Sequence, residues 1–115
     1  MSDPGTSFLF LCRKMYFDGY TPSNKILHPS ESYQTLCNLA QQLIAKRGNE
    51  GFALYFCESQ YLVDLWAAHF ILEYGRPTDI MKTRALYVVN KYAQMSIKIK
   101  LAQEEKAWLK ENGYV

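Results

Sequence analysis

The sequence predicts a mainly α fold, a compact helical domain of about four helices with a long C-terminal helix. Its 115 residues match the usual length of one domain, so we expect residues 1–115 to fold as a single unit. Apolar residues recur three and four positions apart over most of the chain, which is the spacing of one helix face. Gly and Pro contribute only 6 and 4 residues, and several stand where helices would end.

The first predicted helix covers residues 7–17. Its apolar stripe follows helical spacing and consists of Phe8, Leu11, Cys12, Met15 and Tyr16. The stretch is also rich in aromatic residues and precedes Asp18-Gly19, so the alternative is an α+β fold with a strand over 8–17 that enters a hairpin. We expect residues 1–6 to be a frayed start and residues 18–28 to be a loop.

The second predicted helix, over residues 29–47, has the clearest signals. Pro29 suits the first helical position, and Glu31 places a negative charge in the first turn, at the positive end of the helix dipole. Gly48 follows as a natural terminator. The apolar stripe between these ends contains Tyr33, Leu36, Cys37, Ala40, Leu43 and Ile44.

The middle of the chain is the most apolar part. Residues 52–57 form a short apolar run that fits either a buried strand or the start of a helix. Ser59 could cap a third helix over 59–74, which Gly75 and Pro77 would stop. This helix is apolar nearly all round, which is typical of a central helix covered by its neighbours.

The last predicted helix, over residues 77–112, is expected to end with Gly113 in a left-handed cap and Tyr114 against Leu109. Its heptad spacing defines a seam that we expect to bind a partner chain, namely Met81, Val88, Tyr92, Met95 and Ile99. A straight helix of about 35 residues would be about 50 Å long and would overhang a domain of this size. A second apolar face at Ile97, Leu101 and Trp108 requires another covering or a bend near Ser96.

Basic residues are concentrated between positions 76 and 100. Six Lys and Arg residues stand there against Asp79 alone, a local balance of +5 in a chain whose net charge is +2. We expect a basic ridge, flanked by Tyr87 and Tyr92, that would meet an acidic protein or nucleic acid. The ridge consists of Lys82, Arg84, Lys91, Lys98 and Lys100.

One polar group interrupts the apolar middle of the chain. Asp64, His69 and Glu73 share the predicted 59–74 helix, with His69 and Glu73 four residues apart. A histidine–carboxylate pair can serve acid–base chemistry, and the set could line a small-molecule pocket. The simpler interpretation is a structural histidine that hydrogen-bonds to Glu73.

Several function classes are not expected. The three cysteines, Cys12, Cys37 and Cys57, are odd in number and widely spaced, which argues against a disulfide framework or a zinc site and favours a reducing cytoplasm. The longest apolar stretch, over 52–72, contains Asp64 and His69, which argues against a membrane span. No nucleotide-binding or hydrolase motif is present. We therefore predict no catalytic residue, metal or cofactor.

These patterns predict a non-enzymatic protein-binding or adaptor module that self-associates, as a two-fold homodimer, through the C-terminal helix. The alternative is a nucleic-acid-binding protein that uses the basic 76–100 ridge. A second alternative is a small-ligand or catalytic pocket around His69.

Overall fold

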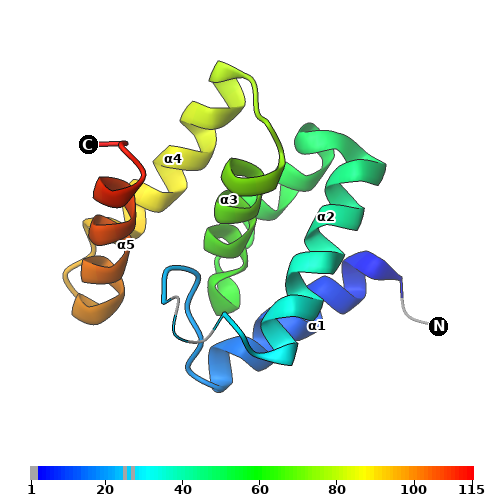
Figure 1. Cartoon of the computed structure of the whole chain (residues 1–115), viewed down its shortest axis with the longest axis horizontal. Helices are drawn as coiled ribbons and strands as arrows, with labels where there is room; N and C mark the ends of the chain where they lie inside the picture. The colour runs from blue at the N-terminus through cyan, green and yellow to red at the C-terminus, as the bar shows by residue number, and fades with distance from the viewer. Residues whose placement is uncertain (1–2, 25, 27) are drawn as a thin grey trace.

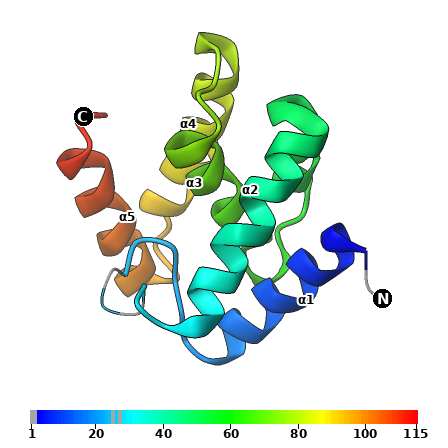
Figure 2. The same ribbon diagram turned by 45° about the vertical axis from the view of Figure 1, so that its right-hand side comes forward.

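The computed structural model describes residues 3–24, 26 and 28–115, and its fold is all-α, which confirms the predicted class. Two short 3₁₀ helices connect α2 to α3. Successive α-helices pack against each other, so that α3 lies in the middle with α2 on one side and α4 on the other (Figures 1 and 2). The elements are α1 (Pro4–Phe17), α2 (Glu31–Phe52), η2 (Ala53–Cys57), η3 (Gln60–Leu62), α3 (Val63–Tyr74), α4 (Asp79–Ala93) and α5 (Ile99–Glu111).

The helix predicted over 7–17 is confirmed, and the strand alternative there is wrong. The helix begins earlier than expected, because the Asp3 carboxylate accepts hydrogen bonds from the amides of Gly5 and Thr6. The expected frayed start is therefore helical from residue 4, while residues 1 and 2 lie outside the described residues. Gly19 takes a positive φ of 82° and closes the helix, with the Tyr20 amide donating to the Met15 carbonyl at 2.9 Å. Asp18-Gly19 thus ends a helix instead of turning a hairpin.

The helix predicted over 29–47 is confirmed as the main part of α2. It starts two residues later, because Ser30 is the capping residue and its hydroxyl accepts from the Tyr33 amide. Gly48 interrupts the helix with φ at 72°, and the chain then resumes helical geometry to Phe52. The predicted stripe packs inward, since Leu36, Ala40 and Leu43 are buried in the core.

The connection from α2 to α3 differs from both expectations. Residues 53–57 form the 3₁₀ helix η2, so the strand proposed for 52–57 is wrong. Ser59 makes no capping hydrogen bond, and the chain tightens into η3 before α3 begins at Val63. Tyr61 and Leu62 both have left-handed backbone, with φ at 55° and 59°. The predicted central position of this helix is confirmed, because every residue from Val63 to Ile71 is buried.

The helix expected over 77–112 is not continuous, and the alternative of a bend near Ser96 is confirmed. The chain leaves helical geometry after Ala93 and re-enters it at Ile99. This break folds α5 back against α4, so that Leu101, Trp108 and Leu109 join the common core. Burying such side chains yields about 1.5–3 kcal/mol each, which exceeds the roughly 1 kcal/mol for each helix hydrogen bond given up. The expected end is confirmed, since Gly113 has φ at 76° and the Tyr114 amide donates to the Leu109 carbonyl.

Because of the break, most of the predicted seam packs inside the chain instead of facing a partner. Met81, Val88 and Tyr92 are buried within their own chain, and only Met95 and Ile99 are exposed. The radius of gyration of 13.2 Å is that of a compact domain of this length, so no helix overhangs it. The argument for a dimer through this seam therefore loses its basis.

Within the described part of the chain, no helix has both the length and the apolar character needed to cross a bilayer.

The burial of the thiols generates a first prediction. Cys12 and Cys37 are buried, and burial raises the pKa of both thiols, whereas Cys57 is exposed. We expect a thiol reagent such as Ellman's reagent to label Cys57 within minutes in the native protein, and all three cysteines in guanidinium chloride. The Cys57→Ser variant should leave almost no fast-reacting thiol. Rapid labelling of Cys12 or Cys37 in native conditions would contradict the packing of α1 and α2.

Candidate functional site

The structure does not bring the predicted polar residues Asp64, His69 and Glu73 together. Asp64 and His69 are buried on different sides of α3, while Glu73 is exposed near its end. Asp64 interacts with α4 and His69 interacts with α5. The three side chains therefore do not form one pocket, and the expected His69–Glu73 hydrogen bond is replaced by a contact between His69 and Glu105.

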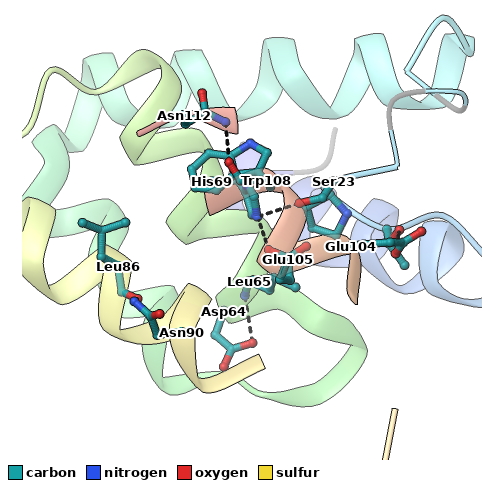
Figure 3. A network of polar contacts seen from close by, with 12 residues as sticks. Ser23, Asp64, Leu65, His69, Leu86, Asn90, Glu104, Glu105, Trp108 and Asn112 are labelled. Carbon is teal, nitrogen blue, oxygen red and sulfur yellow. Dashed lines mark hydrogen bonds and ion pairs between the residues drawn. The ribbon is translucent and has the colours of Figure 1, made fainter. Parts of the chain in front are cut away.

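His69 and Glu105 form a buried pair between α3 and α5 (Figure 3). Nε2 of His69 donates to Oε1 of Glu105 at 2.6 Å, and Oγ of Ser23 lies 3.4 Å from the same nitrogen. The side chains are 3% and 0% exposed, and the His69 and Trp108 rings pack edge to face with centroids 4.3 Å apart. Nδ1 of His69 and Oε2 of Glu105 are buried without a hydrogen-bond partner among the described residues.

Asp64 makes the equivalent connection to α4. Its Oδ1 accepts from the Tyr92 hydroxyl at 2.7 Å and its Oδ2 accepts from Lys91 Nζ at 2.9 Å. Burial, followed by the Asp64 carboxylate, raises the pKa of Tyr92, so this hydroxyl remains a donor at neutral pH. The predicted seam and ridge residues Tyr92 and Lys91 thus hold α4 on α3.

Both networks are chemically suited to holding helices together. A solute cannot reach His69 or Glu105 unless α5 moves away, because neither side chain is accessible. Among the described residues, no three His, Cys, Asp or Glu side chains gather as metal ligands would.

Sequence reasoning missed Glu105 because it is 36 residues from His69. Its signal was its position in the apolar stripe of α5, between the pairs Leu101, Ala102 and Trp108, Leu109.

The surface carries a second feature, which we call the aromatic face. Phe10 and Phe17 are 70% and 67% exposed, and they lie seven residues apart on the side of α1 that faces away from the core. Phe17, Tyr16 and Tyr61 form a cluster with ring centroids 5.6–5.7 Å apart, and the Arg13 guanidinium lies over Phe17 and Tyr61. The face comprises Leu9, Phe10, Arg13, Tyr16, Phe17, Tyr61, Met95 and Lys98.

Tyr61 is placed between two grooves of the aromatic face. One groove, of about 230 Å³, lies between α1 and the 58–63 segment, and the other, of about 400 Å³, reaches the turn between α4 and α5. The left-handed backbone at Tyr61 costs about 1 kcal/mol or more for a side chain of this kind. The bond from the Asp64 amide to the Glu58 carbonyl closes the segment and holds the conformation in place.

The predicted basic ridge is not one surface. Lys91 is engaged by Asp64, and Lys100 is exposed at the start of α5. The other three cations lie over rings of different elements, Lys82 over Tyr114, Arg84 over Phe56 and Lys98 over Tyr16. Arg84, Lys91 and Lys98 are seven residues apart and would share one edge of a continuous helix, but the break after Ala93 removes Lys98 from that edge.

No family model, curated protein or solved structure matches this chain.

The His69–Glu105 pair generates a prediction about α5. In Glu105→Ala, the buried imidazole loses its partner, which we expect to lower the free energy of unfolding by about 3 kcal/mol. Amide hydrogen exchange should accelerate first in α5, because this pair ties α5 to α3. Glu104→Ala is the matched control, since Glu104 is partly exposed and, among the described residues, accepts a hydrogen bond from the Thr21 hydroxyl alone. Equal losses in both variants would show that the pair does not hold α5.

The Asp64–Tyr92 contact generates a prediction about coupling. We expect Asp64→Ala to destabilise the protein by roughly 2–3 kcal/mol, since it leaves a buried hydroxyl without an acceptor, and Tyr92→Phe by about 1 kcal/mol. The double variant should lose less than the sum, which a denaturant double-mutant cycle measures. Asp18→Ala, which breaks the exposed ion pair with Lys14, should cost much less, because water screens that pair. Additive losses at Asp64 and Tyr92 would mean that the two groups do not interact.

Proposed function

We propose that this chain is a non-enzymatic protein-binding module and that the aromatic face is its interface. The observation that supports this is the exposure of Phe10 and Phe17 around Arg13 on one side of α1. A group of large apolar side chains exposed on one side of a protein often marks an interaction surface. Aromatic residues, Met and Arg are also the residue types that are enriched in protein interfaces.

The charges of the face favour an acidic partner. Lys14 is neutralised by Asp18. Arg13 and Lys98, in contrast, rest on rings and form no ion pair with any described residue. A partner surface with carboxylates beside apolar side chains would satisfy both cations and cover the rings. Two copies joined two-fold through this face would tend to bring like charges together, so a different protein fits better than a second copy.

The proposed compartment is the cytoplasm. All three cysteines are free in the structure, and Cys57 is exposed, which is the usual state of thiols in a reducing environment.

The test uses variants that remove the rings without touching the core. We expect Phe10→Ser plus Phe17→Ser to weaken binding of the physiological partner at least tenfold, with thermal stability nearly unchanged because both rings are exposed. Ile80→Ser on α4 is the matched control, since Ile80 is equally exposed but lies outside the face.

The partner is identified with the full chain carrying a photo-crosslinking residue at position 17, and its affinity is then measured with purified proteins. Partner binding that survives the double substitution, or that Ile80→Ser reduces equally, would contradict the proposed interface. Light scattering on the purified chain separates self-association from binding of another protein. A dimer mass that reverts to a monomer in the double variant would replace the acidic partner with a second copy.

A further inference from the structure

A further surface groove lies between η2 and α4, and it shares no lining residue with the aromatic face. Its volume is about 430 Å³, within the range of ligand sites. We call it the basic groove, and it is lined by Phe56, Thr83, Arg84, Tyr87, Val88 and Lys91. The groove contains two members of the predicted ridge, Arg84 and Lys91, and the tyrosine that stands between them.

The groove offers two aromatic rings to a ligand. Tyr87 is 74% exposed on α4, three residues after Arg84 and four before Lys91, so all three share one side of the helix. Phe56 is half-buried on η2, and the Arg84 guanidinium lies 5.8 Å from its ring centroid. Tyr87 therefore presents a ring to solvent between two cations, and the Arg84 guanidinium adds a second flat surface.

Arg84 and Lys91 differ in how much of their hydrogen-bonding capacity is free to bind a ligand. Lys91 Nζ contacts the buried Asp64 carboxylate, yet the lysine side chain remains 41% exposed and has further N–H donors. Arg84 has a ring contact with Phe56 but no ion pair within the described part of the chain. Arg84 is thus the cation with most unused capacity for a bidentate contact to a phosphate.

The groove continues along α4. A neighbouring groove of about 330 Å³ is lined by Tyr87, Asn90, Lys91 and Gln94 and shares Tyr87 and Lys91 with the first. From Arg84 to Gln94 the helix rises about 15 Å. This length accommodates more than one nucleotide unit, with the Tyr87 ring near the middle.

We infer that the basic groove binds single-stranded nucleic acid, with phosphates on Arg84 and Lys91 and a base stacked on Tyr87. Rings beside cations form the usual platform for unpaired bases, whose faces are accessible only when the strand is not in a duplex. An acidic peptide would use the same two cations, and the polyglutamate competitor described below distinguishes it from a nucleic acid. This site goes beyond the proposed protein interface and does not depend on it.

The test uses fluorescein-labelled dT12 and rU12 with the full chain, measured by fluorescence anisotropy at 50 and 200 mM NaCl. We expect saturable binding at 50 mM that weakens about sevenfold at 200 mM, since two neutralised phosphates give a logarithmic salt slope of about −1.4 for a single strand. A twelve-residue polyglutamate is the polyanion control. It should compete at least tenfold less well than unlabelled dT12.

Matched variants locate the binding on the groove. Arg84→Gln should weaken dT12 binding about tenfold, while Lys82→Gln, which removes the same charge from the same helix beside Tyr114, should change it less than twofold. Tyr87→Leu should weaken binding about tenfold, and Tyr87→Phe should restore it. Thermal melting should be nearly unchanged in all four variants, because these side chains are exposed.

Three results would overturn the inference. They are no saturable oligonucleotide binding at 50 mM NaCl, equal losses in Arg84→Gln and Lys82→Gln, and polyglutamate competing as well as dT12. Phe10→Ser plus Phe17→Ser should leave dT12 binding intact, so failure here and failure of the proposed protein interface are separate outcomes.

Discussion

The fold depends on one constraint. The helix α3 is buried over most of its length, yet it carries two polar side chains, the carboxylate of Asp64 and the imidazole of His69. Every residue from Val63 to Ile71 is covered, so Asp64 and His69 can be tolerated only if neighbouring helices supply polar partners. Tyr92 and Lys91 of α4 supply them for Asp64, and Glu105 of α5 supplies one for His69. The positions of α4 and α5 are therefore specified by hydrogen bonds as well as by apolar packing.

This constraint explains why the C-terminal third is two helices. A single straight helix could bring Tyr92 to Asp64, but it would carry Glu105 and Trp108 away from His69. The break at residues 94–98 returns α5 to α3, and the buried Trp108 ring then packs against the His69 ring. The turn that results leaves Met95 and Lys98 beside the C-terminal end of α1, where they extend the aromatic face.

The sequence predicted the helices well where the signals were local. Ser30, Gly19, Gly75 and Gly113 act within a few residues of themselves, and the helix ends lie near them. The break after Ala93 has no glycine or proline to mark it. The second apolar face suggested a bend near Ser96, but it did not show which distant residues α5 packs against. Glu105 was missed for the same reason. Its partner lies on another helix, and no alternation within α5 identifies which helix that is.

The surface residues also divide into those that local spacing could place and those that depend on contacts between distant segments. Heptad spacing correctly placed Arg84 and Lys91 on one side of α4, but it could not show that η2 brings Phe56 opposite them. Spacing also identified Phe8, Cys12 and Met15 on the inner side of α1, but it wrongly included Tyr16, which is exposed on the aromatic face. Phe10 and Phe17 were unassigned because they fall outside the stripe. Phe10 and Phe17 bury little surface within the chain, since they are 70% and 67% exposed, so burial in the core does not account for their being apolar. Such residues are therefore the most informative positions for function, and here they occur beside cations that lack carboxylate partners among the described residues.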